Sequence, residues 1–378
     1  MRRTIGVGSI GVGGEGQNIA RACRQVPLWF PEANVEPRLI SCADSVAPLA
    51  EEVKDRLGFE KWSDRWMDVI EDPAVEVVMV ATPNDVHLEV ARAAAAAGKH
   101  LFCEKPVGRG PDETVAIGKA VRGAGIVFMV GYNFRFVPVV EHARDLIRAG
   151  GLGELTHYRG RYFLDYDSES KQPLSWRYRE EASGYGALAD LMSHVADMAM
   201  SLAGPIERVV ANRKTFVTER RLEASEMGEV GPVDNDDYVG ALVEFSNGAM
   251  GTLEVCRTIQ GPTNEHGFEV NGTEGSVKWN LERFNELQVD LKGSEETGYT
   301  QVFSAPGHGD HGAFNAGAGL GPGLRDLKTI ELHRFFRAVL GEAEPVPGIA
   351  EALAVAVVQR AMARSWESDG WEGVEGGQ

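Results

Sequence analysis

The sequence predicts an α/β protein in which a doubly wound parallel sheet is followed by an α+β domain. Three observations support this fold class. Residues 1–132 repeat the order strand, helix, strand; the apolar run at 75–81 is nearly continuous, as in buried parallel strands; and strands with alternating polarity follow the glycines at 150–153. We therefore expect two domains, at 1–132 and 133–378.

Length and charge limit the functions that the chain can have. A chain of 378 residues is too long for one ordinary core. Its 38 Lys and Arg against 56 Asp and Glu give a formal net charge of -18, which argues against nucleic acid or anionic membrane as a partner and favours a small ligand. The four cysteines stand far apart, which fits neither a disulfide framework nor a zinc site and indicates the reduced cytoplasm.

A glycine turn follows the first expected strand and precedes a helix at 17–25. In such turns one glycine makes the bend, one lets backbone N–H groups approach a pyrophosphate, and one packs helix on strand; the residues in question are Gly11, Gly13, Gly14, Glu15 and Gly16. The next strand, at 38–43, ends in Asp44, which is placed to accept hydrogen bonds from an adenosine ribose, or alternatively to cap a helix.

The interval from the glycine turn to Asp44 is long, and we attribute it to an inserted loop at 27–31. Neither Arg nor Lys follows Asp44 directly, so no cation is provided for a 2'-phosphate, and NAD is favoured over NADP.

The first domain continues with helices at 46–57 and 63–70, a strand at 75–81, a helix from 85 to Gly98, a strand leading to Lys105, and a last helix and strand at 111–124 and 126–132. Ligands bind such sheets at the carboxyl ends of the strands. The segments that fall there are the glycine turn, Asp44, Ala81-Thr82-Pro83-Asn84, Glu104-Lys105 and Tyr132-Asn133.

Lys105 is the residue to which we assign the chemistry. A lysine that closes a buried strand can be partly desolvated, which disfavours its charged form and allows it to relay a proton. The alternative is a solvated strand end.

The second domain begins after a helix at 138–149. Its clearest strand pair is 238–245 with 249–258 around an Asn-Gly turn, and 267–280 is a further hairpin. Helices are expected at 327–340 and 349–366. The glycine-rich loop 307–323 carries His308 and His311, which we expect to be solvated and mobile; a lid is the alternative.

One amphipathic helix, at 187–202, matters for chemistry. Its apolar side chains share one face, while Asp190, His194, Asp197 and Ser201 share the opposite one. An Asp and a His four positions apart can hold a substrate hydroxyl and accept its proton. The alternative is a solvated helix face. No third ligand stands at a fixed spacing, so we expect no metal.

Together these residues resemble the Gfo/Idh/MocA oxidoreductases. The resemblance covers nearly the whole chain and rests on the glycine turn, Ala81-Thr82-Pro83-Asn84 with His87, Ala97-Gly98-Lys99-His100 running into Glu104-Lys105-Pro106, Trp176-Arg177, and Gly186-Ala187-Leu188-Ala189-Asp190 with His194 and Asp197. It implies a Rossmann domain that binds NAD, followed by a domain with an open, mostly antiparallel sheet that binds substrate and forms dimer or tetramer contacts.

The resemblance also implies the roles of single residues. The catalytic group would be Lys105, Asp190 and His194. Cofactor contacts would come from Gly11, Gly13, Gly14, Glu15, Gly16, Asp44, Ala81, Thr82, Pro83, Asn84, His87, Glu104, Lys105, Trp176 and Arg177. Substrate contacts would come from Lys105, Tyr132, Asn133, Arg135, Asp190 and His194, with core packing as the alternative for Tyr132 and Trp176.

The implied reaction is NAD-dependent oxidation of a secondary hydroxyl of a monosaccharide, an anhydrosugar or an inositol-like polyol to a ketone. Two alternatives remain. One is a glycosidase that oxidises its substrate transiently while keeping its NAD, and the other is a non-catalytic sensor that binds NAD. Tyr185 stands where many members of the family have a small residue, and it could change substrate choice.

Overall fold

The computed structural model describes residues 2–168, 172–222, 229–295 and 297–375. The chain forms two compact units, Met1–Asn133 with Gly323–Leu353, and Phe134–Pro322 with Ala354–Gln378. The predicted domain boundary, after residue 132, lies one residue before the point where the chain passes from the first unit to the second. The segment 323–353, however, packs with the first unit and not with the second, because the helix it contributes lies against a helix of the first unit.

The first unit is built on a six-stranded sheet in the order β3-β2-β1-β4-β5-β6, with every neighbouring pair parallel. This is the doubly wound order that the repeated strand and helix units predict. The strands are β1 (Arg3–Ile10), β2 (Val35–Ala43), β3 (Lys61–Ser63), β4 (Val77–Val80), β5 (His100–Cys103) and β6 (Phe128–Val130).

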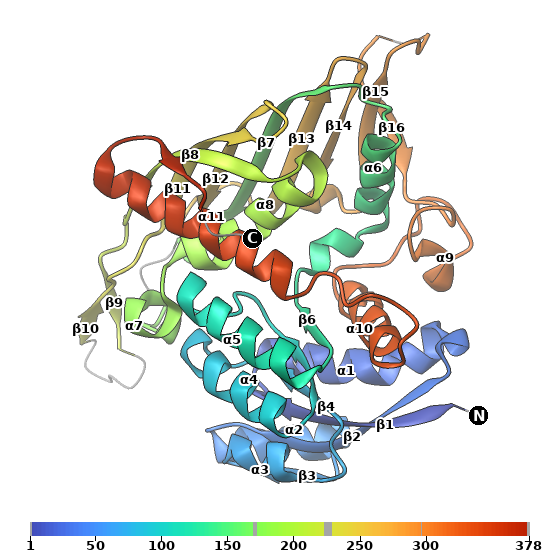
Figure 1. The fold of residues 1–378 in the computed structure, drawn as a ribbon, viewed down its shortest axis with the longest axis vertical. Helices are drawn as coiled ribbons and strands as arrows, with labels where there is room; N and C mark the ends of the chain where they lie inside the picture. Colours follow the sequence, from blue (N-terminus) through green and yellow to red (C-terminus); the bar gives the residue numbers. More distant parts are fainter. Residues whose placement is uncertain (1, 169–171, 223–228, 296, 376–378) are drawn as a thin grey trace. The chain divides into compact units, whose positions relative to one another are not determined.

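Helices of the first unit lie side by side in pairs, α1 with α10 and α4 with α5, as Figure 1 shows. Their bounds are α1 (Gly14–Trp29), α2 (Ala47–Leu57), α3 (Trp66–Glu71), α4 (His87–Ala96), α5 (Pro111–Ala124) and α10 (Asp326–Val339), with 3-10 turns η1 (Pro31–Ala33) and η2 (Asn84–Val86).

Two local predictions in this unit were wrong. The loop expected at 27–31 begins as helix, since α1 runs through Pro27 to Trp29; Val26 and Pro27 are buried, and their packing holds the last turn despite the missing proline N–H. Ser63 belongs to a strand and not to a helix, because β3 pairs with β2 at the edge of the sheet.

The second unit is built on a nine-stranded sheet in the order β16-β15-β14-β13-β7-β12-β11-β8-β17. The pair β7 and β12 is parallel and the other neighbours are antiparallel. The strands are β7 (Leu155–Leu164), β8 (Ile206–Lys214), β11 (Tyr238–Phe245), β12 (Met250–Cys256), β13 (Asn264–Gly272), β14 (Gly275–Asn280), β15 (Glu286–Leu291), β16 (Thr300–Phe303) and β17 (Glu372–Gly373).

Both predicted hairpins are present in this sheet. In the turn between β11 and β12, Gly248 has a φ of +86°, a backbone conformation that favours glycine. A separate two-stranded sheet pairs β9 (Glu219–Arg221) with β10 (Val230–Pro232).

The helix α8 (Ala187–Ala203) packs on one face of the large sheet, against β7 and β12 (Figure 1). The other helical elements are η3 (Asn133–Phe136), α6 (Pro138–Arg148), η4 (Trp176–Tyr178), α7 (Glu180–Ser183), α9 (His311–Phe314), α11 (Ile349–Ser368) and η5 (Leu281–Arg283).

The solvated-face alternative for α8 was wrong at two of its four polar positions. Fourteen residues along α8 are buried, including His194 and Asp197, whereas Asp190 and Ser201 are partly exposed. The sheet covers one side of the helix and aromatic side chains cover His194 on another.

The loop 307–323 is also more ordered than predicted. His311 is fully buried, where its Nδ1 lies 2.6 Å from the Ser304 hydroxyl and its Nε2 lies 2.9 Å from the Gly317 carbonyl oxygen. The ring of His308 stacks on His142 at 4.1 Å. The prediction of a solvated side chain was therefore wrong for His311, whereas His308 is partly exposed and stacks on His142.

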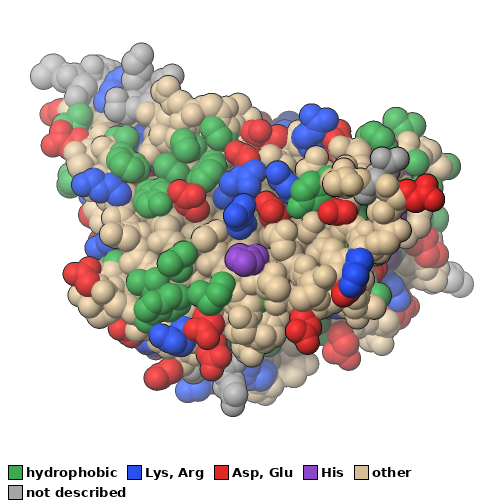
Figure 2. Space-filling view, turned by 90° about the horizontal axis from the view of Figure 1, so that it is seen from above, with side chains coloured by type: hydrophobic (Ala, Val, Ile, Leu, Met, Phe, Trp, Pro, Cys, Tyr) green, Lys and Arg blue, Asp and Glu red, His purple; other side chains and the backbone are tan. Residues whose placement is uncertain are grey.

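The face drawn in Figure 2 carries small apolar patches between charged side chains. Lys and Arg lie beside Asp and Glu there, without a continuous basic strip among the described residues of that face. Within the described parts of the chain, no helix combines the length and the hydropathy that a membrane-spanning segment needs.

Candidate active site

The carboxyl ends of the parallel strands form one continuous edge in the first unit. Hydrogen bonds continue one residue past each strand: Gly11 N–H donates to Ala43 O at 2.9 Å, and Ala81 N–H to Ile10 O at 2.9 Å. On the far side, Glu104 N–H donates to Val80 O at 2.9 Å. The edge therefore brings together the glycine turn, Asp44, the 81–84 segment and Glu104-Lys105, as the sequence predicted.

The glycine turn has the geometry that a pyrophosphate requires. Gly11 has a φ of +80°, and a Cβ on it would lie 2.6 Å from Ala81 O. A Cβ on Gly16 would lie 2.0 Å from Gly11 O, so this glycine permits the close packing of α1 on the turn. Gly13 and Gly14 face open space, with no atom within 4 Å of a Cβ. The start of α1 is thus accessible to an anion, and these residues fit a dinucleotide.

Asp44 follows β2 and turns its carboxylate back toward the glycine turn. Val12 N–H donates to its Oδ2 at 2.9 Å, and Val46 N–H donates to its Oδ1 at 3.0 Å. The helix-cap alternative was wrong, because the N-cap of α2 is Val46 and Asp44 bonds the N–H of that residue and not an N–H of the helix. Each oxygen keeps a second lone pair, so the carboxylate can still accept a ribose hydroxyl.

His87 holds two loops of the edge together. Its Nδ1 lies 3.0 Å from Pro106 O and its Nε2 lies 3.1 Å from Thr82 O. The side chain is 1% exposed, and burial lowers the pKa of the imidazole. We had expected His87 to contact the cofactor; its position instead ties the loop after Lys105 to the segment that carries Asn84.

Glu104 is one of four charged side chains that meet at this edge. The Lys328 ammonium on α10 lies 2.6 Å from Glu104 Oε1, 2.7 Å from Glu331 Oε2 and 3.5 Å from Glu15 Oε1. Lys328, Glu104 and Glu331 are buried, while Glu15 is half exposed. Glu104 Oε2 lies against Gly131, where a Cβ would come within 2.6 Å of it.

Burial and charge act in opposite directions in this cluster. Burial would lower the pKa of Lys328, but the three carboxylates outweigh it and raise that pKa well above its ordinary value. Burial raises the pKa of Glu104, and it raises the pKa of Glu331 to about 8. Burial raises the pKa of Glu15, but the charge of Lys328 and smaller contributions from other neighbours together outweigh burial, and the pKa of Glu15 is lowered overall. Burial thus favours the protonated form of Glu331.

Lys328 and Glu331 were not predicted from the sequence. They stand three positions apart in α10, within a run of buried residues that includes Leu327, Ile330 and Leu332. A lysine and a glutamate within an apolar stretch of a helix indicate a buried pair, and this signal was available.

Lys105 and the two residues after β6 complete the candidate residues of the first unit. Lys105 is partly exposed at the end of the β5 edge, next to the buried Glu104. Tyr132 is 2% exposed, which agrees with core packing, whereas Asn133 is partly exposed.

Asp190 and His194 lie one turn apart on α8 in the second unit. The His194 ring packs edge-on against Phe134 at 4.8 Å, and the ring of Tyr162 lies 6.0 Å away. Burial raises the pKa of Tyr162, and the charge of Asp190 raises it further. Asp190 is partly exposed and His194 is 8% exposed, so the pair sits in a largely apolar, aromatic surrounding.

The third polar residue of this helix, Asp197, forms an ion pair with Arg135. Arg135 Nε donates to Asp197 Oδ2 at 2.7 Å and its Nη2 donates to Oδ1 at 2.6 Å. Both side chains are largely buried. We had placed Arg135 among the substrate contacts; this pairing gives it a role in fixing η3 to α8.

His266, on β13, is a residue near His194 that the sequence did not indicate. Its ring lies 4.9 Å from Tyr162 and 6.3 Å from His194. Its Nδ1 lies 3.2 Å from Arg161 O, and burial lowers its pKa to about 4. The imidazole of His266 is therefore neutral and packs among the rings that surround His194. A lone histidine in a strand gave no signal for this position.

Trp176 and Arg177 form η4 in the second unit. The Arg177 guanidinium lies over the Trp176 ring at 4.6 Å, and both side chains are at least partly exposed. Tyr185 packs edge-on against Trp366 of α11 at 6.1 Å. Among the described residues, no group of three or more His, Cys, Asp or Glu is arranged to hold a metal ion.

Comparison with known proteins assigns both units to one family. Residues 5–132 match the oxidoreductase family with an NAD-binding Rossmann fold, and residues 140–278 match the GFO/IDH/MocA C-terminal domain. Levoglucosan dehydrogenase of Pseudarthrobacter phenanthrenivorans is 37% identical, over 98% of each chain. Scyllo-inositol 2-dehydrogenase (NAD(+)) of Bacillus subtilis is 30% identical, over 64% of this chain and 65% of that protein.

Solved structures agree with these matches. Levoglucosan dehydrogenase in complex with NADH and levoglucosan superposes with a TM-score of 0.95 at 37% identity, and covers 99% of this chain and 100% of its own. The glycine turn, the Rossmann strand order and the sequence identity over almost the entire length lead to one conclusion: the chain belongs to the Gfo/Idh/MocA family of oxidoreductases, with an NAD-binding Rossmann domain.

Proposed function

We propose that this protein is an NAD-dependent dehydrogenase that oxidises a secondary hydroxyl of an anhydrosugar, a monosaccharide or a cyclic polyol to a ketone. The observation that carries this proposal is the sheet edge where the open glycine turn, Asp44 and Lys105 gather. The relatives named for levoglucosan and for inositol support the substrate class. Levoglucosan is the first substrate to test, because that relative matches nearly the full length of the chain.

The proposed roles of the side chains follow from their chemistry. His194 accepts the hydroxyl proton, Asp190 orients the imidazole, and Lys105 stabilises the negative charge that develops on the substrate oxygen. Bound NAD would accept the hydride. Placed acid-base groups contribute roughly two to four orders of magnitude in rate, and the rest comes from positioning and from the cofactor.

The cofactor contacts proposed for the first unit are the glycine turn with Glu15, Asp44, the 81–84 segment and Glu104-Lys105. His87 does not contact the cofactor in this proposal; it holds the loops that carry these contacts through its bonds to Thr82 O and Pro106 O. The proposed contribution of Trp176 and Arg177 rests on their exposed side chains.

A panel of levoglucosan, other anhydrosugars, monosaccharides and inositols with NAD, followed at the absorbance of NADH, tests the function. We expect NADH in proportion to oxidised product. The variant Lys105→Ala should lose turnover and keep the wild-type melting temperature, while Lys119→Ala, on the exposed side of α5, should match wild type. Glycoside cleavage without net NADH would support the glycosidase alternative, and NAD binding without turnover would support the sensor.

We further propose that copies of the chain associate through the outer face of the nine-stranded sheet, and that the protein works in the reduced cytoplasm. Leu242 and Met250, on neighbouring strands, expose 48% and 40% of their surface on this face. All four cysteines are free and buried, which suits a reducing compartment. Light scattering of wild type and Leu242→Glu tests the association: the variant should shift toward a smaller species.

A further inference from the structure

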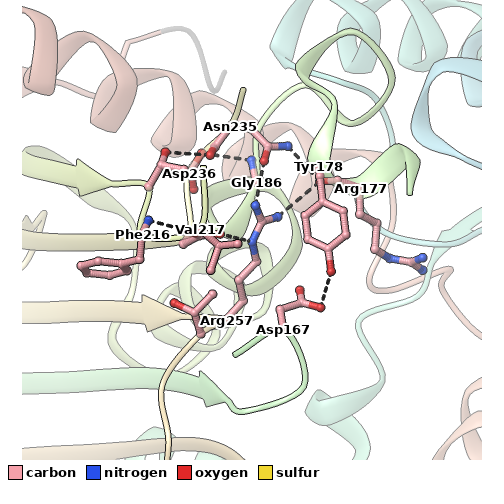
Figure 3. Close-up of polar contacts among 12 residues, drawn as sticks. Asp167, Arg177, Tyr178, Gly186, Phe216, Val217, Asn235, Asp236 and Arg257 are labelled. Carbon is pink, nitrogen blue, oxygen red and sulfur yellow. Dashed lines mark hydrogen bonds and ion pairs between the residues drawn. The ribbon is translucent and has the colours of Figure 1, made fainter. Parts of the chain in front are cut away.

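The buried carboxylate of Asp236 caps α8 from another part of the chain. The N–H groups of Gly186 and Leu188 donate to its two oxygens at 3.0 and 2.7 Å, and Ala187 N–H donates to its backbone oxygen at 2.8 Å. The first N–H groups of a helix lack partners within the helix. A single residue about fifty positions away supplies three of those partners, and Figure 3 shows it beside Gly186.

Gly186 permits this contact because it has no side chain. A Cβ on Gly186 would lie 1.9 Å from the backbone oxygen of Asp236, too close for any other residue without movement of the backbone. The close approach of Asp236 therefore explains the glycine at the start of α8.

Asn235, next to Asp236, holds the segment that contains Trp176 and Arg177. Its Nδ2 donates to Arg177 O at 2.8 Å and to Ser183 Oγ at 3.0 Å. Its Oδ1 accepts from Arg257 Nη2 at 2.8 Å. The Asn235 side chain thus holds the backbone of η4. The side chain of Trp176 remains partly exposed and that of Arg177 exposed.

Asp237, the third of these residues, anchors the arrangement to the large sheet. Its Oδ1 accepts from Arg257 Nε at 2.8 Å, and its Oδ2 accepts from the N–H groups of Phe216 and Val217 at 2.7 and 2.9 Å. Arg257 also lies over the ring of Tyr178 at 4.8 Å, and it donates to Arg177 O at 3.3 Å. Figure 3 shows the guanidinium between Asn235 and Tyr178.

We propose that Asn235, Asp236 and Asp237 together form a positioning bracket for the active-site segments of the second unit. Asp236 sets the position of α8, which carries Asp190 and His194, and Asn235 sets η4, which carries Trp176 and Arg177. Asp237, through Arg257, joins the two arms to the sheet. This inference rests on the proposed function, because the two segments it positions are the proposed substrate and cofactor contacts.

The physical reason is the complete burial of the bracket. Asn235, Asp236 and Asp237 are exposed by only 2%, 0% and 0%. A buried polar network whose hydrogen bonds are all made is rigid, and the loss of one partner leaves another buried group unpaired. A displacement of about 1 Å in a catalytic side chain can cost about a hundredfold in rate. The side chains of the bracket reach the proposed ligand contacts only through the backbone oxygen of Arg177 and the first N–H groups of α8, so their effect must pass through η4 and α8.

The first test replaces Asp236 by Asn, which keeps the shape and removes one acceptor. The amide can accept from only one of the two N–H groups, so the start of α8 is released. We expect kcat to fall about tenfold to a hundredfold, with the KM for sugar and the Kd for NAD within about threefold of wild type. The matched control is Asp234→Asn, since Asp234 accepts from Glu180 N–H at 2.6 Å and thereby caps α7 and not α8.

The second test separates the two arms. Asn235→Ser removes the donor to Arg177 O and keeps a polar side chain. We expect the KM for NAD or for sugar to rise about tenfold while kcat stays within about threefold. A purely structural role would lower the melting temperature of both variants and change both kinetic constants together. If Asp236→Asn does not fold, Asn235→Ser and Arg257→Lys carry the test.

Hydrogen exchange makes the test independent of turnover. The amides of Gly186, Ala187 and Leu188 should exchange slowly in wild type and in Asp234→Asn, and at least about tenfold faster in Asp236→Asn. Unchanged exchange, or kcat within about twofold of wild type, would overturn the bracket and leave the proposed function standing. If wild type is inactive while these amides are protected, the proposed function is wrong, and the bracket has no role in catalysis. The hydrogen bonds from Asp236 to the start of α8 would still be confirmed.

Discussion

The ammonium of Lys328 lies 2.6 Å from the carboxylate of Glu104, the residue directly before Lys105. The two side chains are 4% and 11% exposed. The ion pair links α10 to the carboxyl end of β5, so a segment near the C-terminus supports the edge where we place the chemistry.

Lys328→Met should destabilise the protein strongly. The change replaces the ammonium by a slightly shorter apolar side chain and leaves the Glu104 carboxylate buried without its cation. Breaking a buried pair in this way costs about 3 to 5 kcal/mol in the free energy of unfolding. Urea unfolding measures the loss, and Lys54→Met, which breaks an exposed pair with Asp55, should cost much less. A loss within about 1 kcal/mol would show that the carboxylates find other partners.

Stability should also depend on the proton of Glu331. Its pKa is raised by burial to about 8 in the folded protein, so the folded state holds a proton that the unfolded state releases above its ordinary pKa of 4.5. Stability from this group is therefore full below about pH 4.5 and is lost as pH rises through about 8, at no more than about 1.4 kcal/mol per pH unit. Glu331→Gln should lack this fall.

Urea unfolding of wild type and Glu331→Gln between pH 5 and 9 isolates the contribution of Glu331, because all other groups are shared. Glu342→Gln, which changes an exposed carboxylate just after α10, serves as the control. Parallel pH curves for wild type and Glu331→Gln would mean that the proton resides elsewhere in the cluster.

NAD should be preferred over NADP. Asp44 would face a 2'-phosphate with like charge, which costs several kcal/mol and so about a hundredfold or more in kcat/KM. Asp44→Asn should narrow the preference while it keeps an acceptor for Val12 N–H, whose bond to Asp44 Oδ2 is 2.9 Å long. The ratio of kcat/KM for the two cofactors is the measurement, and a wild-type preference for NADP would remove Asp44 from the ribose site.

Activity should require the neutral imidazole of His194. If His194 accepts the substrate proton, the rate of oxidation rises with pH as the ring loses its proton, and the midpoint belongs to the coupled group with Asp190 and Lys105. His194→Asn should lower kcat far more than NAD affinity, by about two orders of magnitude or more, and should abolish or move that rise. Pre-steady-state hydride transfer across pH avoids masking by product release. An unchanged profile would leave Lys105 as the base.

Local patterns in the sequence predicted most of the first unit. Glycine spacing and apolar runs predicted five of its six strands, the helices between them and the residues at the sheet edge, because each signal acts within a few positions. They could not predict that α10 joins this unit, since the contact between Phe102 and Phe335, with ring centroids 5.8 Å apart, depends on a distant segment.

Burial was the property that local patterns misjudged. The amphipathic periodicity left a solvated face as the alternative for Asp197 and His194, yet Arg135 pairs with the first and aromatic rings pack against the second. His311 was assigned to a mobile loop by its glycine-rich context, and buried hydrogen bonds to Ser304 and to the Gly317 carbonyl oxygen fix it. For Asp197 and His194 the partners that decide the outcome stand far away in the chain.

The division of the chain into interleaved units also sets an order for biosynthesis. The first unit needs Gly323–Leu353, and the second needs Ala354–Gln378. On the ribosome, neither unit can be completed until nearly the whole chain has emerged. Until then, the first 133 residues expose to water the apolar surface that α10 later covers. A gene fragment that encodes only those residues should yield aggregated protein, and an isolated cofactor-binding unit would have to be expressed with the α10 segment joined to it.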